Sequence, residues 1–148
     1  MLTHGHYDHV GAVQGLKDAS GCRVFLPEAD LALPPSITDG PIAYTDLYRD
    51  GDVLRFGPIE LKALCTPGHT PGSSCLQTGN RLFTGDTLFR GSCGRTDLVG
   101  GDMEEELRSL RRLCSLEGDY EVYPGHMDSS TLARERLFNY YCRAAMSR

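Results

Sequence analysis

Residues that commonly bind metal ions open this sequence, because MLTHGHYDH holds His4, His6, Asp8 and His9 within six positions. Neutral imidazoles and carboxylates are the usual protein ligands of Zn²⁺, Fe²⁺ and Mn²⁺. Without a cation, such a cluster repels itself when charged and is costly to desolvate. In an extended stretch His4 and His6 point the same way, whereas Asp8 and His9 diverge as the chain turns into a helix. The cluster therefore predicts metal binding, with the second pair able to serve a second ion.

Three further residues of ligand type follow turns elsewhere in the chain. His69 lies in TPGHTPGS, Asp86 follows an apolar run in LFTGDTLF, and His126 lies in YPGHMDSS. A histidine alone in a Pro-Gly turn is usually a solvated turn residue, but strand ends followed by glycine-rich turns also position functional side chains. Together, five histidines and two aspartates exceed one tetrahedral site and fit two sites that share a bridging carboxylate.

The elements that must hold these residues alternate between strands and helices. Short apolar or alternating runs bounded by Gly and Pro predict strands, and stretches with helical periodicity predict helices. We expect strands at 22–26, 53–56, 59–65, 74–78, 81–84 and 120–124, helices at 10–19, 103–114 and 130–145, a helical turn at 28–33 and an irregular loop at 33–46. A loop of that length in a compact domain is often functional. The class is α/β or α+β, with helices layered on sheet.

Helix 103–114 carries the clearest local signals. Asp102 is its predicted N-cap, and Glu105, three residues later, matches the pattern of a capping box. The predicted apolar stripe consists of Met103, Leu107, Leu110 and Leu113. These signals predict that one face of the helix packs against the sheet.

Bulk composition argues against several classes of function. The chain has 148 residues, the size of one domain over 1–148, and 40% of its residues are hydrophobic. Its net charge of −5, without a Lys/Arg run, argues against a nucleic-acid partner. No apolar run is long enough for a membrane span, and the N-terminus has no secretory signal, so we expect the cytoplasm. Six cysteines without a C-x-x-C pair are typical of reduced, mostly buried thiols.

The ordered motifs HGHYDH, TPGHTPGS, FTGDTLF and YPGH resemble those of the metallo-β-lactamase superfamily of hydrolases. GDTLFRGSCGRTDL looks most like the glyoxalase II and persulfide dioxygenase branch of that superfamily. The resemblance implies an αββα sandwich of two mixed sheets flanked by helices. It also implies that two divalent ions are bound, zinc in the first place and iron or manganese as alternatives. The implied first ion is held by His4, His6 and His69, the second by Asp8, His9 and His126, and Asp86 bridges the two.

The activity implied by the resemblance is hydrolysis of a thioester such as a hydroxyacylglutathione, with Asp8 and Asp86 as the catalytic residues. The ions would lower the pKa of a water to roughly 7, and the resulting hydroxide would attack the thioester carbonyl. Arg95 could pair with a carboxylate of such a small-molecule substrate, or instead form a surface ion pair with Asp97. Cys93 is interpreted as a packed turn cysteine.

Two alternatives remain open at this point. The persulfide dioxygenase branch implies a single Fe²⁺ held by His4, His69 and Asp86. The other alternative is an inactive, truncated fragment, because a strand needs ~5–6 residues and only three residues precede His4. We expect the αββα sandwich to lack its first strands, His4 to lie near a free end without preorganisation, and the chain alone to be marginally stable and weakly active.

Overall fold

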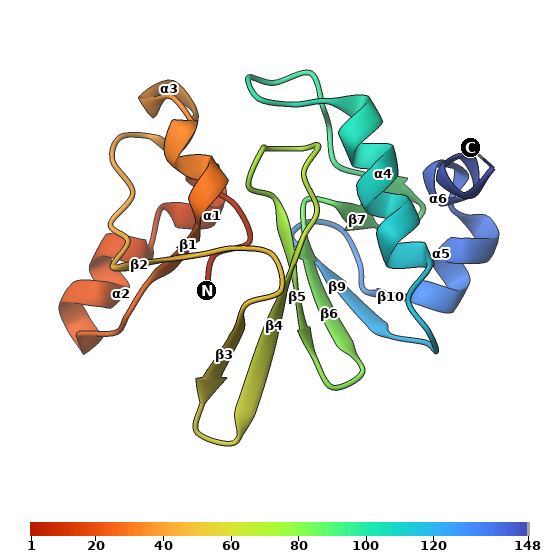
Figure 1. The fold of residues 1–148 in the computed structure, drawn as a ribbon. Coiled ribbons are helices and arrows are strands. Elements are labelled where there is room, and N and C mark those ends of the chain that lie inside the picture. Colours follow the sequence, from red (N-terminus) through yellow and green to blue (C-terminus); the bar gives the residue numbers. More distant parts are fainter. Residues whose placement is uncertain (148) are drawn as a thin grey trace.

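A computed structural model describes residues 1–147, which form four layers in the order helix, sheet, sheet, helix (Figure 1). The expected αββα arrangement is confirmed, but only the six-stranded sheet is mixed: the other sheet has two parallel strands, and a separate two-stranded hairpin follows the six-stranded sheet's fourth strand in the sequence. The first helical and strand layers contain α1 (Tyr7–Val10), α2 (Val13–Ser20), β1 (Phe25–Pro27), the 3₁₀ helix η1 (Glu28–Ala32), α3 (Pro35–Thr38) and β2 (Asp46–Tyr48). The remaining elements are β3 (Val53–Phe56), β4 (Ile59–Cys65), β5 (Ser74–Thr78), β6 (Arg81–Gly85), β7 (Leu88–Phe89), β8 (Ser92–Cys93), α4 (Met103–Cys114), β9 (Glu121–Pro124), β10 (Ser130–Thr131), α5 (Leu132–Phe138) and α6 (Tyr140–Met146).

The six-stranded sheet has the order β10-β9-β6-β5-β4-β3 and is antiparallel except where β6 runs parallel to β9. On β6, Leu82 and Thr84 are buried while Arg81 and Phe83 are exposed, as expected for side chains that alternate between faces. The register between β6 and β9 shifts between Phe83 and Gly85. Because both parallel strands end at the same edge of the sheet, the residues that follow them emerge side by side.

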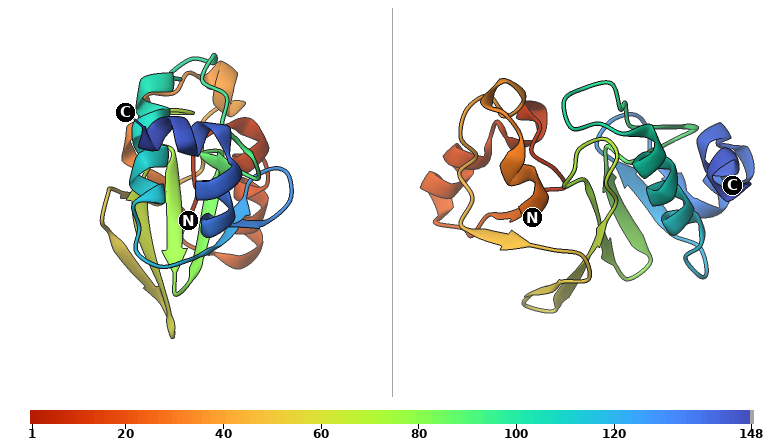
Figure 2. Two further views of the ribbon diagram at one scale, coloured as in Figure 1. Left: turned by 90° about the vertical axis from the view of Figure 1, so that its right-hand side faces the viewer. Right: turned by 45° about the horizontal axis from the view of Figure 1, so that its top comes forward.

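Helices α4, α5 and α6 lie on one side of the six-stranded sheet (Figure 2). Leu107, Leu110 and Leu113 of α4 are buried against Leu82 and Val122 of the sheet. The Asp102 carboxylate accepts the Glu105 backbone N–H at 3.0 Å, so the predicted N-cap is confirmed. Met103 is exposed, and the buried face of α4 instead includes Glu106, which the stripe did not predict.

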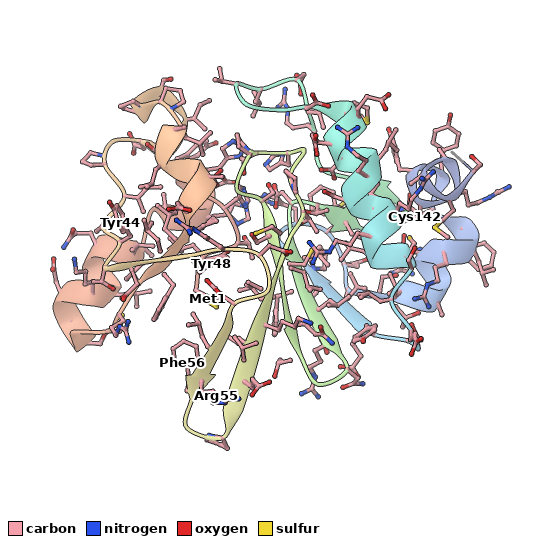
Figure 3. All side chains as sticks on the ribbon, viewed as in Figure 1. Met1, Tyr44, Tyr48, Arg55, Phe56 and Cys142 are labelled. Carbon is pink, nitrogen blue, oxygen red and sulfur yellow. The ribbon has the colours of Figure 1, made fainter. Side chains whose placement is uncertain are left out.

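The first three residues connect the two sheets, and Met1 packs against the cluster that contains Tyr48 of β2 (Figure 3). The Leu2 backbone N–H donates to the carbonyl of Phe25 on β1, and the Ser74 N–H of β5 donates to the carbonyl of Thr3, both at 2.9 Å. The buried Tyr48 hydroxyl of β2 donates to the Leu2 carbonyl at 2.6 Å. His4 is fully buried, so the expectation that it lies loosely at a free end is wrong.

Several expected element boundaries are corrected by the structure. The helix expected at 10–19 is two helices, α1 and α2, and the strand expected at 22–26 is β1, shifted to Phe25–Pro27. The irregular loop contains α3 and β2, and β2 is stabilised as a strand by its parallel pairing with β1. The terminal helix is interrupted at Asn139, whose extended backbone ends α5 while its side chain accepts the N–H groups that begin α6.

Among residues 1–147, no helix combines the length and the apolar character that a membrane crossing requires. All six cysteines are free, and four of them are buried, as expected for reduced thiols.

Candidate metal centre

Three buried histidines from two loops form the first ligand cluster. His4 and His6 precede α1, and His69 lies in the turn between β4 and β5. One ring nitrogen of each lies within 4.8 Å of the others. His69 Nδ1 lies 2.7 Å from the carbonyl oxygen of Arg95, to which it donates, so Nε2 is left with its lone pair facing the cluster.

The second ligand cluster, formed by Asp8, His9 and His126, is more exposed. Asp8 and His9 lie on α1, whereas His126 follows β9, and their ligand atoms also lie within 4.8 Å of one another. His126 Nε2 is 3.1 Å from Asp8 Oδ2 and 3.3 Å from His9 Nε2. The side chains of His126 and Asp8 are 51% and 37% exposed, so this cluster is open to solvent and to small molecules.

Asp86 lies between the two clusters. Its Oδ2 is 3.5 Å from His69 Nε2 and 3.4 Å from His126 Nε2, while Oδ1 is 3.3 Å from His9 Nε2. It follows β6 directly after the register shift, a kind of irregularity that often re-aims a side chain. A Cβ at Gly125 would lie 2.4 Å from Asp86 Oδ1 and 2.6 Å from His9 Cε1, so only glycine leaves room for this arrangement.

Burial keeps His4 and His6 of the first cluster unprotonated. Desolvation lowers the pKa of His4 to about 2 and that of His6 to about 4, with neighbouring histidines adding to the effect. Burial opposes the charge on His9, but the Asp86 carboxylate, 3.3 Å away, and the Asp8 carboxylate raise its pKa overall. Burial also opposes ionisation of Asp86, yet the nearby His9 and the surrounding histidines lower its pKa overall. Neutral imidazoles and ionised carboxylates are the protonation states that bind metal.

Unpartnered polar atoms indicate what this centre lacks. In the described part of the chain, six buried side-chain nitrogen and oxygen atoms have no hydrogen-bond partner. Four of them are His4 Nε2, His6 Nε2, His69 Nε2 and Asp86 Oδ1. Buried polar atoms are rarely left unsatisfied, because each costs about 1–3 kcal/mol. A divalent cation would satisfy all four, so the donor set fits a metal ion.

Asp30 of η1 is a supporting residue that the sequence motifs did not reveal. Its buried carboxylate accepts the backbone N–H of Gly5 at 2.8 Å and that of Gly72 at 2.7 Å, and also the Thr70 hydroxyl at 3.1 Å. It therefore joins the loop that carries His4 and His6 to the loop that carries His69. In the sequence, the only sign of this supporting role of Asp30 is an aspartate with no assigned function in a short predicted helical turn.

Glu106 is a second residue that sequence reasoning missed. It is fully buried on α4, and both of its carboxyl oxygens belong to the six unpartnered atoms. Desolvation raises its pKa to about 9, although the backbone N–H groups of His69 and Gly94 act in the opposite direction. The signal was present in the sequence, since Glu106 lies three residues after Met103 and four before Leu110, on the apolar stripe.

A cavity of about 650 Å³ opens beside the centre and is lined by His6, Asp8, His69, Asp86 and His126 among others. Arg95 lies on its wall and forms a two-bond ion pair with Asp97, with both N–H···O distances at 2.7 Å. Of the two interpretations of Arg95, the ion pair is therefore present, and a contact with substrate stays a prediction. Cys93 also lines the cavity, and burial raises its pKa to about 12, consistent with a packed thiol.

Comparison with known proteins identifies the family. A family model described as "Metallo-beta-lactamase superfamily" matches residues 1–126. A hydroxyacylglutathione hydrolase of Brucella anthropi is 39% identical, over 93% of this chain and 50% of that protein. The crystal structure of ETHE1 from Myxococcus xanthus has a TM-score of 0.82 at 31% identity, covering 97% of this chain and 64% of that one. TTHA1623, solved in a di-iron-bound form, has a TM-score of 0.81 at 37% identity, and the match covers 94% of this chain and 74% of that one. With its ordered His and Asp motifs held in an αββα sandwich, the chain belongs to the metallo-β-lactamase superfamily.

Proposed function

We propose that this protein is a metal-dependent hydrolase that cleaves a thioester, such as a hydroxyacylglutathione. The observation that carries the proposal is the position of Asp86, whose two oxygens face histidines of both ligand clusters at 3.3–3.5 Å. A carboxylate shared in this way suits a pair of divalent ions better than a single one. Asp86 is therefore the proposed bridging ligand.

We propose that six of the seven ligand residues act as the two sets expected from the sequence and that Asp86 is shared between them. His4, His6 and His69 would hold one ion, Asp8, His9 and His126 the other, and we propose zinc, with iron or manganese as alternatives. When bound, such ions polarise a carbonyl and supply hydroxide at neutral pH. The low pKa values of His4 and His6 keep both imidazoles ready to bind metal without releasing a proton.

Asp8 and His126 of the second cluster line the cavity in which a substrate would lie. Their side chains are 37% and 51% exposed, whereas those of His69 and Asp86 are nearly buried, so Asp8 and His126 are the members of the centre that a bound small molecule would contact first. Asp8 is, with Asp86, a proposed catalytic residue. The proposal includes a small-molecule thioester or thiol conjugate as substrate, no nucleic-acid or membrane partner, and a place in the cytoplasm.

The test combines metal analysis with thioester turnover. We expect two ions per chain and hydrolysis of S-lactoylglutathione, followed by the loss of its absorbance. Asp86→Ala should lower turnover by more than about 100-fold, since losing even a hydrogen-bond partner of a metal ligand costs 10- to 100-fold. Asp18→Ala, on the exposed face of α2, is the matched control. Undiminished thioesterase activity in Asp86→Ala would refute the role of this residue.

A second candidate is a mononuclear iron dioxygenase acting on a persulfide. It is supported by the difference in burial between the two clusters, since the first is buried and the second is exposed. Two sites that differ in this way can differ in metal affinity, so that one ion is bound and the other site is not filled. Its ligands would be His4, His69 and Asp86, with open positions for oxygen and substrate. One iron per chain and oxygen uptake with glutathione persulfide would favour it over the hydrolase. A purified chain with neither metal nor turnover would instead be an inactive fragment.

A further inference from the structure

The residues that line the cavity beside the metal centre indicate which kind of thioester would bind there. Resting on the proposed thioesterase function, we propose that this cavity favours a thioester with an apolar acyl chain and an uncharged thiol carrier, and that S-lactoylglutathione, with its hydroxyacyl group and charged carrier, is a poorer substrate. We further propose that Met127 and the Arg95–Asp97 pair set this selectivity.

Apolar side chains from four separate segments line the cavity. Ile37 comes from α3, Phe89 from β7, Leu98 from the loop before α4, and Met127 from the loop after β9. Ile37, Phe89 and Leu98 are half-buried, so each retains apolar surface that a ligand can cover. A cavity of about 650 Å³ with such walls is within the usual size range of small-molecule sites.

Met127 directly follows the ligand His126 and has an unusual backbone. Its φ of 69° lies in the left-handed region, which is sterically unfavourable for residues other than glycine. Its side chain is nevertheless large, apolar and 66% exposed. Strained positions of this kind cluster at ligand sites, and the flexible thioether of methionine adapts to apolar ligands of different shape. An exposed methionine next to a metal ligand is therefore well placed to contact an acyl chain.

The charges around the cavity leave little for an anionic ligand to bind outside the metal centre. Among residues 1–147, Arg95 is the only lysine or arginine that lines the cavity, and Asp97 occupies its guanidinium with two bonds of 2.7 Å. Arg90, next to Phe89, lies 3.2 Å from the carboxylate of Asp128, next to Met127. A carrier with free carboxylates, such as glutathione, would have to compete with an aspartate for either guanidinium. An uncharged carrier meets no such competition.

Acyl chain length is the first experimental variable. The metal-loaded, full-length chain is assayed with S-acyl-N-acetylcysteamine thioesters from acetyl to hexanoyl, and thiol release is followed. Burying one methylene is worth about 0.8 kcal/mol, so kcat/KM should rise about fourfold per added carbon until the cavity is full. For one acyl group, the uncharged N-acetylcysteamine thioester should also be a better substrate than the S-acyl glutathione. A flat chain-length series, or a preference for the glutathione thioester, would overturn the proposal.

Variants at the two proposed determinants test the assignment of residues. Met127→Lys should lower kcat/KM for the hexanoyl thioester and raise kcat/KM for the glutathione thioester, which changes the ratio between the two substrates. Met103→Lys adds the same charge at an exposed position outside the cavity and should leave this ratio unchanged. Asp97→Asn, which frees Arg95, should shift the ratio toward the glutathione thioester by up to about fivefold, the strength of an exposed ion pair. If both substitutions leave the ratio unchanged, Met127 and Asp97 are not the determinants.

A binding measurement separates the two proposals. S-alkyl-N-acetylcysteamine thioethers, which cannot be hydrolysed, are titrated into the zinc-loaded protein by calorimetry. Affinity that rises with alkyl length in the absence of any thioester turnover would support the cavity assignment and contradict the hydrolase. Thioester turnover without any dependence on chain length, in rate or in binding, would support the hydrolase and contradict the cavity assignment.

Discussion

Replacing Glu106 by glutamine should stabilise this protein at neutral pH. The carboxyl group is fully buried on α4, and the backbone N–H groups of His69 and Gly94 do not offset the desolvation of its charge. Burial raises its pKa to about 9 in the folded state, from an ordinary value of 4.5. Between these values the folded protein holds a proton that the unfolded chain releases, so stability falls as pH rises through this window. At about 1.4 kcal/mol per pH unit, the loss reaches about 3 kcal/mol at pH 7. Glutamine has nearly the same shape and never ionises, so it removes this loss.

The assay is urea unfolding of the metal-free wild type and Glu106→Gln, followed by circular dichroism from pH 5 to pH 8. The difference in unfolding free energy between the two proteins should be small near pH 5 and grow to about 3 kcal/mol in favour of the variant at pH 7. Taking the difference cancels the titration of the histidines, which both proteins share. Glu117→Gln, an exposed glutamate after α4, is the control and should show no such trend. A difference for Glu106→Gln that does not change with pH would refute the reasoning.

Two further perturbations test how the ligand loops are held. Asp30→Ala should lower the free energy of unfolding by about 3 kcal/mol or more, because the buried N–H groups of Gly5 and Gly72 lose their acceptor at about 1–3 kcal/mol each. The variant should also bind zinc more weakly. An unchanged urea midpoint together with an unchanged zinc affinity would contradict this role of Asp30. Acidification should destabilise the metal-free protein, because the pKa of His4 is lowered to about 2, so below pH 6.5 the unfolded chain takes up a proton that the folded chain does not. At pH 5 this amounts to about 2 kcal/mol for His4. The measurement is the difference in unfolding free energy between the wild type and His4→Gln as a function of pH. A difference that does not change with pH would show that His4 takes up a proton in the folded protein.

Local patterns were sufficient for much of the six-stranded sheet and for α4. The strands expected at 53–56, 59–65 and 74–78 coincide with β3, β4 and β5, because Gly and Pro bound each run and alternation identifies the faces. Asp102 caps α4 as expected, but the Glu105 carboxylate bonds Arg108 instead of completing a capping box. Local signals therefore predict elements well where each run satisfies its own hydrogen bonds or those of its sequence neighbour.

The elements that were missed depend on distant partners. The parallel pairing of β2 with β1 joins residues about 21 positions apart, such as Phe25 and Asp46, and no alternation marks β2 in the sequence. The short β7–β8 hairpin and the interruption at Asn139 are linked to each other, because the Asn139 amide donates to the carbonyl of Ser92 at 2.9 Å. Such contacts override local helical or loop preference, and they are visible only once the chain is folded.

Residue types alone determined the chemistry of this protein: histidines and aspartates in H-x-H-x-D-H and after three turns indicate a metal centre, whatever the fold. Tertiary structure alone decided how these residues meet, for example that His9 and His126, 117 positions apart, face each other at 3.3 Å. It also decided that Asp30 joins two ligand loops, that Glu106 is fully buried, and that Asp97 pairs with Arg95. The physical reason is that ligand chemistry is a property of single side chains, whereas burial, charge pairing and distance depend on segments that only the folded chain brings together.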